Sequence, residues 1–266
     1  MSLILEYLPV WAIVLLLLSL FWTASFIGNR MRERMRVASE ATYASSAAVS
    51  LLVLLISFTF SLALNRYDNR RDLGVEEAAA IYSTWERVQL LPPDKSTEMA
   101  GILRAYADER LLYFKFGIDK DDQMRADQSA DDLMAKMWVL LRDEVATSQQ
   151  PLVTRMLMDN LTRIDDAAWR REAMARARIP FFVIDLLVIF SLLTAASMGL
   201  SGPQGRRVHP AHTIFFLLNA SAIMLVIDLD RPREGMIQIS QRPMLELIEI
   251  MKDDIVLWSK TSSSKM

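Results

Sequence analysis

The chain contains no cysteine and only two histidines among its 266 residues. Without cysteine, the protein has no disulfide bond, thiolate metal site or cysteine nucleophile. The two histidines, His209 and His212, stand in one short segment and are too few for a zinc site. The sequence also lacks a glycine-rich phosphate-binding loop and any visible pairing of a nucleophile with a base. We therefore predict that the protein is not an enzyme and has no bound cofactor or metal.

A strong excess of charge of one sign is also missing. The 30 basic and 32 acidic residues give a net charge of −2. Nucleic-acid binding proteins usually carry a large basic excess, so we expect no nucleic-acid partner. What the chain has in excess is apolar residues, which make up 52% of the sequence and are concentrated in a few segments.

Almost all of the continuous apolar sequence falls in four runs, at residues 8–27, 44–64, 179–200 and 210–229. A helix needs about 20 apolar residues to cross the hydrocarbon core of a bilayer, so each run predicts a membrane-spanning helix. No Lys or Arg precedes the first run and a basic cluster follows it at residues 30–36. This charge order is the reverse of a signal peptide, and we interpret the run as a retained span.

The segment between the second and third spans resembles an ordinary soluble domain. Its apolar residues recur at helical spacing, and the turn signals are Pro92-Pro93, Gly117 and Pro151. We predict an all-α polytopic membrane protein with a helical domain inserted between spans 2 and 3. The predicted divisions are residues 1–64 (spans 1 and 2), 65–178 (extramembrane domain), 179–229 (spans 3 and 4) and 230–266 (extramembrane, with a disordered tail from 260).

Four spans place both termini and residues 65–178 on the same side of the membrane. Ten arginines lie near span ends on that side, against six in the loops 28–43 and 201–211 on the other. The larger number favours a cytoplasmic location for that side, in an inner or plasma membrane. The first span taken alone argues the reverse, because its flanking cations follow it.

The second run contains four hydroxyl residues and ends abruptly in a polar cluster. A helix that faces only lipid has no need of four hydroxyls, whereas a helix in a bundle or along a pore can use them. The hydroxyl residues are Ser50, Ser57, Thr59 and Ser61, and the cluster comprises Asn65, Arg66, Asp68, Asn69, Arg70 and Arg71. The cluster can either attract anions or form interfacial anchors and salt bridges.

Further charged residues have structural and functional interpretations. Glu76 and Glu77 can pair with Arg70, Arg71 or Arg104, and we favour this structural role over catalysis. We predict that Asp68 likewise forms structural ion pairs. Asp185 lies inside the third run, where an ionisable residue is a functional candidate. It also lies close enough to Arg178 to pair with it at the membrane interface, which we favour.

Several short elements resemble the bestrophin-like domain family of membrane proteins. The elements are Ser57-Phe58-Thr59-Phe60, Arg66-Tyr67-Asp68, Arg70-Arg71, Glu76-Glu77-Ala78, Ala80-Ile81, Leu90-Leu91-Pro92 and, after the last span, Leu229-Asp230-Arg231-Pro232. The family is more distantly similar to the bestrophin anion channels. Those are oligomers, usually pentamers, in which the second span lines a narrow hydrophobic neck.

The resemblance implies a pore along the second span. In the channels an Arg-Tyr pair follows a neck Phe by eight residues, the separation of Phe58 and Arg66 here. Steps of four residues along that helix face add Leu54 and Ser50, with Ser57 and Ser61 beside them. A ring of Leu and Phe would gate by steric closure or dewetting. The implied protein is a homo-oligomer in a lipid bilayer that passes small inorganic or organic anions, with Arg66, Arg70 and Arg71 as an anion-attracting vestibule.

Two departures from the channels limit what the resemblance implies. Animal bestrophins carry an acidic calcium-binding run after the last span, where this chain has Asp228, Asp230 and Glu234 with cations interleaved, so calcium gating is not predicted. Ser50 is polar where an apolar neck residue is typical. The alternative function is a non-conducting scaffold, in which the same helices only assemble a bundle.

Overall fold

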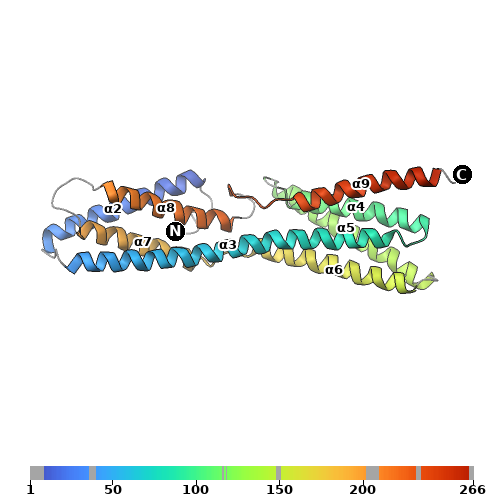
Figure 1. The fold of residues 1–266 in the computed structure, drawn as a ribbon, viewed down its shortest axis with the longest axis horizontal. Helices are drawn as coiled ribbons and strands as arrows, with labels where there is room; N and C mark the ends of the chain where they lie inside the picture. The colour runs from blue at the N-terminus through green and yellow to red at the C-terminus, as the bar shows by residue number, and fades with distance from the viewer. Residues whose placement is uncertain are drawn as a thin grey trace. The chain divides into compact units, whose positions relative to one another are not determined.

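The computed structural model describes residues 9–35, 40–115, 117, 119–147, 151–201, 210–231 and 235–263. All regular structure in these ranges is α-helical, and no strand occurs within them. The helices are α2 (Val10–Met35), α3 (Glu40–Val88), α4 (Pro93–Tyr113), α5 (Lys120–Thr147), α6 (Pro151–Arg176), α7 (Phe181–Ser201), α8 (Pro210–Asp230) and α9 (Arg242–Ser263) (Figure 1). The predicted all-α class is confirmed.

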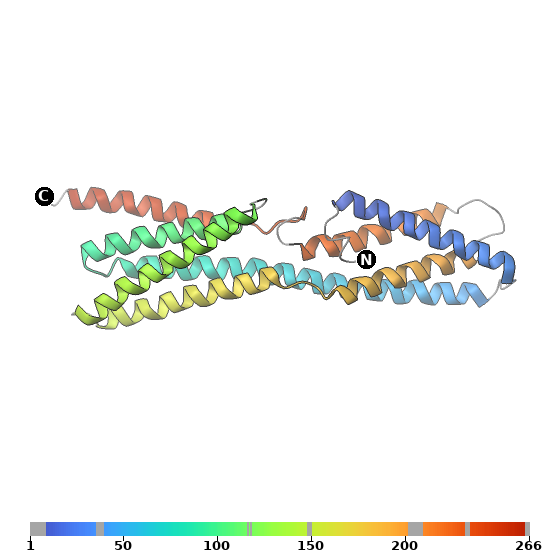
Figure 2. The ribbon, with the colours of Figure 1, turned by 180° about the vertical axis from the view of Figure 1, so that it is seen from behind.

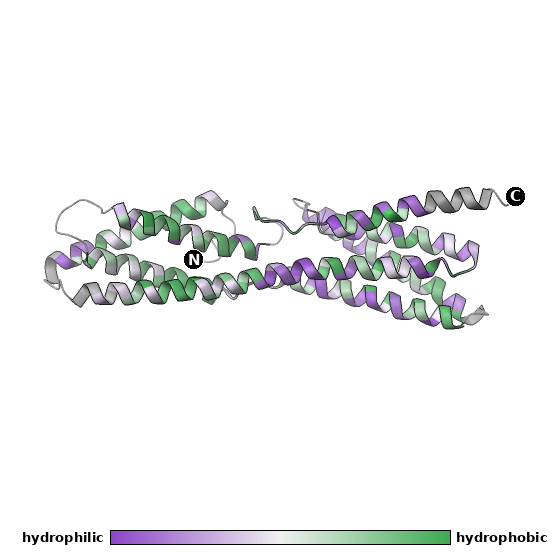
Figure 3. Ribbon diagram, viewed as in Figure 1, coloured by the Kyte–Doolittle hydropathy of each residue, from purple (hydrophilic) through white to green (hydrophobic). Residues whose placement is uncertain are grey.

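The described chain has four helices, α2, α3, α7 and α8, with stretches long and apolar enough to cross a membrane. The predicted number of about four spans is therefore confirmed. Figure 3 shows that α2, α7, α8 and the first half of α3 are mostly hydrophobic, whereas α4, α5 and α6 alternate between hydrophobic and hydrophilic turns. The helical domain between spans 2 and 3 is confirmed by this contrast.

The chain forms two compact units. The first comprises Met1–Tyr67 and Arg178–Ile237, and the second comprises Asp68–Ala177 and Gln238–Met266. Helix α3 contributes to both, because it continues for 49 residues and extends well beyond residue 64, where the second span was predicted to end. By contrast, residues 177–180 interrupt the helix between α6 and α7, where Pro180 cannot donate a backbone hydrogen bond.

In the first unit, α2 and α7 pack with their backbones unusually close. A Cβ atom built on Gly28 would lie 2.0 Å from the carbonyl oxygen of Ala196, and one built on Gly199 would lie 2.1 Å from that of Ser25. Glycine is therefore required at both positions. Small residues at helix crossings are typical of membrane proteins, where close packing replaces the hydrophobic driving force.

Helix α3 joins the first unit through one stripe of side chains. Leu52, Thr59 and Ala63 are buried at 0%, 1% and 0% exposure, and their spacing of seven and four residues keeps them on one helix face. At its N-terminal end, the hydroxyl of Ser45 lies 2.8 Å from that of Ser197 and 2.6 Å from that of Ser201. These contacts fix which side of α3 faces the other spans.

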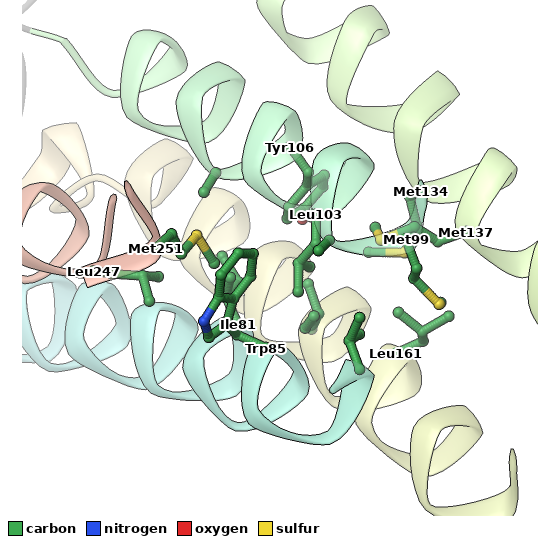
Figure 4. Close-up of a cluster of buried hydrophobic side chains, with 14 of the residues drawn as sticks. Ile81, Trp85, Met99, Leu103, Tyr106, Met134, Met137, Leu161, Leu247 and Met251 are labelled. Atoms are coloured by element: carbon green, nitrogen blue, oxygen red, sulfur yellow. The ribbon is translucent and has the colours of Figure 1, made fainter. Parts of the chain in front are cut away.

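The second unit has its own hydrophobic core. Figures 1 and 2 show α4, α5, α6 and α9 beside the second part of α3. In Figure 4, Trp85 of α3 lies among Leu103 of α4 and Leu247 and Met251 of α9. Helix α9 was not predicted from the sequence, and it extends to Ser263 and so into the tail that was expected to be disordered; residues 264–266 lie outside the described ranges.

Candidate functional site

The predicted pore face of α3 points away from the helices that α3 packs against. Leu54 and Phe58 are 67% and 62% exposed, and Ser50, Ser57 and Ser61 are exposed as well. At about 100° of rotation per residue, these five positions lie roughly opposite the buried stripe. Within one copy of the chain, this face therefore has no protein partner among the described residues.

The hydroxyls of this helix differ in their surroundings. Ser50 donates to the carbonyl oxygen of Ser46 at 3.0 Å and Ser57 to that of Val53 at 2.8 Å. Because both bonds stay within α3, these serines can face an apolar environment at little cost. Thr59 is the hydroxyl residue of this group that is buried against the other spans. The hydroxyls alone therefore do not distinguish a pore from a lipid-facing surface.

The arginines after the span take three different positions. Arg70 is buried, and its guanidinium donates to the carbonyl oxygens of Met174 at 3.2 Å and Ala177 at 2.6 Å. Met174 lies in the last turn of α6 and Ala177 directly follows that helix, where the carbonyls lack intrahelical donors and favour a cation. Arg66 is half-buried and Arg71 is exposed, as is Asp68. The guanidinium of Arg70 is thus used to cap a helix. Of the three arginines, Arg66 and Arg71 are the ones accessible to solutes.

A buried ionic network lies in the second unit, centred on Glu77. Nε of Arg110 donates to Oε1 of Glu77 at 2.5 Å, and Arg171 donates to the other carboxylate oxygen. Nη1 of Arg110 also donates to Oε1 of Glu172 at 2.5 Å. Glu77, Arg110 and Arg171 are each at most 5% exposed. The network joins α3, α4 and α6.

The network keeps Arg110 charged despite its burial. Removal from water disfavours the charged guanidinium, but the neighbouring Glu77, Tyr106 and Glu172 outweigh this penalty and raise the pKa of Arg110 above its ordinary value. Arg171 is held by further contacts. Its Cζ atom lies 3.6 Å from the ring centroid of Phe114, and its Nη2 donates to Oε1 of Gln241 at 2.5 Å. Gln241 directly precedes α9, so the network also positions that helix.

The ion pairs differ in their partners from those considered from the sequence. Glu76 pairs with Arg170 at 2.8 Å, and Glu77 pairs with Arg110 and Arg171. Arg104 forms no ion pair with any described residue. Arg110, Arg171 and Glu172 were missed because they lie 33 to 95 residues from Glu77 in the sequence. Patterns of local residue spacing do not reveal contacts between residues that are so far apart in the sequence.

Two buried carboxylates lie at the end of span 4, and one of them, Asp230, ties that end to the beginning of span 3. Asp228 accepts hydrogen bonds from the backbone amides of Met236 at 2.8 Å and Ile237 at 3.0 Å. Asp230 accepts from the amide of Ile179 with both carboxylate oxygens, and its carbonyl oxygen accepts from Arg178 at 2.6 Å. Backbone donors thus take up oxygen atoms that a cation would need.

Metal binding receives no support from the described residues, which contain no group of three His, Cys, Asp or Glu side chains placed to hold a metal ion. Glu234 and His209 lie outside the described residues. Asp185 is half-buried in α7 and interacts with at least one other group of the protein.

The two units together define a helical multi-pass membrane protein with a helical extramembrane domain. The bestrophin-like domain family model matches residues 10–244, and the chain therefore belongs to that family. Among curated proteins, none matches the chain.

Solved structures show the same fold. A bacterial bestrophin homologue from Klebsiella pneumoniae, solved by Zn-SAD phasing, is 15% identical, with a TM-score of 0.66 over 91% of this chain and 97% of that one. A point variant described in the same words is 16% identical, with a TM-score of 0.65 over 90% and 97% of the two chains. A crystal structure described only as a membrane protein is 14% identical, with a TM-score of 0.68 over 91% and 97%.

Proposed function

We propose that the chain is one subunit of a homo-oligomeric membrane channel for small anions, with α3 lining the pore. The observation that carries this proposal is the exposed face of α3 centred on Leu54 and Phe58. One copy contributes a single such helix, so a pore needs several copies around an axis. The resemblance to bestrophins favours a pentamer.

The residue types on this face suit a hydrophobic neck. A ring of Leu54 and a ring of Phe58, one helical turn apart, would form a constriction that closes sterically or by dewetting. Ser50, Ser57 and Ser61 would add hydroxyl dipoles beside the rings. The hydrogen bonds of Ser50 and Ser57 to the α3 backbone leave their hydroxyl oxygens free to accept from water.

Anions would be attracted by the arginines at the end of the span. Arg71 is exposed and Arg66 is half-buried, whereas the guanidinium of Arg70 is already used to cap α6. We therefore assign the vestibule to Arg66 and Arg71 and exclude Arg70 from it. The arginine distribution around the four spans supports an orientation with both termini and the inserted helical domain in the cytoplasm.

Conduction across planar bilayers by the purified protein tests the proposal. Wild-type protein should carry an anion current, and Leu54→Ala and Phe58→Ala should each change it, because they widen the neck. Leu218→Ala is the matched control. Leu218 is 65% exposed on α8, a helix that does not carry the proposed pore face, and its variant should conduct like wild type. A silent bilayer for wild type and both neck variants would support the scaffold alternative.

A further inference from the structure

A cavity of about 390 Å³ lies between α3 and α6 in the second unit. It is separate from the ionic network around Glu77 and from the exposed face of α3. Its lining residues are Glu76, Ala79, Ala80, Ser83, Asn160, Arg163, Asp166, Ala167 and Arg170. The volume falls within the range of roughly 300 to 1,000 Å³ that is typical of small-molecule sites.

Small side chains create this space. Ala79 and Ala80 of α3 lie across from Ala167 of α6, and none of the three extends past Cβ. Polar groups stand around them. Asn160 is only 4% exposed, and its amide donates to the carbonyl oxygen of Ser83 at 3.4 Å or, in the flipped orientation, accepts from Nε of Arg87 at 3.3 Å. The cavity therefore has an alanine-lined wall and a polar rim.

The four charged side chains that line the cavity sum to zero, and two of them form an ion pair with each other. Glu76 and Arg170 neutralise each other in an ion pair of 2.8 Å. Arg163 and Asp166 remain, and neither charged group forms a hydrogen bond or ion pair with any described residue. They lie three residues apart on α6, so their Cβ atoms are about 5 to 6 Å apart on one helix face. The cavity is open to solvent, and the guanidinium of Arg163 and the carboxylate of Asp166 stand side by side on its exposed rim.

From this arrangement we infer that the cavity binds a small zwitterion carrying a carboxylate and an ammonium group, of the size of a free amino acid. The guanidinium of Arg163 offers paired N–H donors that match a carboxylate, and Asp166 accepts from the ammonium. Because the four charged lining residues sum to zero, a neutral zwitterion is favoured over a simple anion or cation. This inference does not depend on whether the protein conducts ions.

Calorimetric titration of the full chain in detergent tests the inference. The probes are glycine, β-alanine and 6-aminohexanoate, with acetate and propylamine as ligands that carry one of the two charges. At least one zwitterion should bind saturably, and acetate and propylamine should bind at least about tenfold more weakly, because each leaves one charged residue without a partner. Absence of saturable binding by all three zwitterions would overturn the inference, as would acetate binding as tightly as they do.

Variants on α6 locate the site. Arg163→Gln and Asp166→Asn should each weaken zwitterion binding by at least about tenfold. Arg155→Gln and Asp159→Asn are matched controls, since both residues are exposed on the same helix and neither lines the cavity; they should leave binding unchanged. Ala79→Leu should abolish binding by filling the space, whereas Ala173→Leu on the exposed surface of α6 should not. Equal effects of lining and control variants would place any binding elsewhere and refute the site.

Discussion

The Nε atom of Arg110 lies 2.5 Å from Oε1 of Glu77, and the two side chains are 3% and 0% exposed. This contact joins α4 to the extramembrane part of α3, and Arg171 of α6 completes it. Desolvation of these charges is costly, so the pair is weak evidence for net stabilisation. Removing the charge of only one partner, however, destabilises the protein, because the other partner is then left buried and charged.

Glu77→Gln should therefore destabilise the second unit strongly, by about 3 to 5 kcal/mol. The substitution leaves the guanidinium groups of Arg110 and Arg171 without their shared counter-charge. Thermal unfolding in detergent, followed by tryptophan fluorescence, measures the effect as a fall in Tm on the order of 10 °C.

Glu76→Gln is the matched control at the adjacent position. Glu76 and its partner Arg170 are 47% and 51% exposed, and a solvent-exposed pair contributes less than about 1 kcal/mol. Equal losses for the two variants would contradict the structural importance of the buried network.

Gly28→Ala should disrupt the packing of α2 on α7. The new methyl group would lie 2.0 Å from the backbone oxygen of Ala196, which cannot move without the helix. We expect a loss of about 3 kcal/mol or more, the upper end of the cost of overpacking, measured as a lower Tm in detergent.

Gly101→Ala provides the opposite case. A Cβ atom at Gly101, inside α4, meets nothing within 4 Å, and alanine is favoured over glycine in a helix by roughly 0.5 to 1 kcal/mol. This variant should be slightly more stable than wild type. A stable Gly28→Ala protein would show that α2 and α7 do not approach this closely.

The spans were predictable because their signal is local. Each apolar run is long enough by itself to require a membrane, and the hydroxyl-rich second run belongs to the longest helix. The continuity of α3 past residue 64 was not predictable from hydropathy, since polarity changes there while helical geometry does not. The partners of Glu77 could not be predicted either, because Arg110 and Arg171 reach it only through tertiary packing.

Tyr106→Phe should reduce the decrease in the free energy of unfolding that occurs as the pH rises into the alkaline range. Burial disfavours the charged phenolate and raises the pKa of Tyr106 well above its ordinary value, with Arg110 acting in the opposite direction. In the unfolded chain the phenol ionises near pH 10. Above that pH the unfolded state releases a proton that the folded state retains, so stability falls by about 1.4 kcal/mol per pH unit for this residue.

Phenylalanine has no such proton to release. The Tm of Tyr106→Phe should therefore fall less than that of wild type between pH 9 and pH 11 in the same buffers, a range of about one unit either side of the unfolded pKa. Parallel curves would mean that Tyr106 ionises equally in the folded and unfolded chain.

Asn219→Leu should stabilise the protein. Asn219 lies midway along α8, is 4% exposed, and neither amide atom has a hydrogen-bond partner among the described residues. A buried polar group left unsatisfied costs about 1 to 3 kcal/mol, and leucine has a similar branched shape without that cost. We expect a Tm a few degrees higher, at about 2 to 4 °C per kcal/mol for a chain of this size.

The matched control for Asn219→Leu is Asn160→Leu. Asn160 is equally buried at 4%, but its amide donates to the Ser83 carbonyl or, in the flipped orientation, accepts from Nε of Arg87 at 3.3 Å. Leucine at this position removes an amide that has a hydrogen-bond partner and leaves that partner unpaired, so the Tm should fall. If Asn219→Leu also lowered the Tm, the amide of Asn219 would have a hydrogen-bond partner in the membrane, such as a bound water held between α8 and its neighbours.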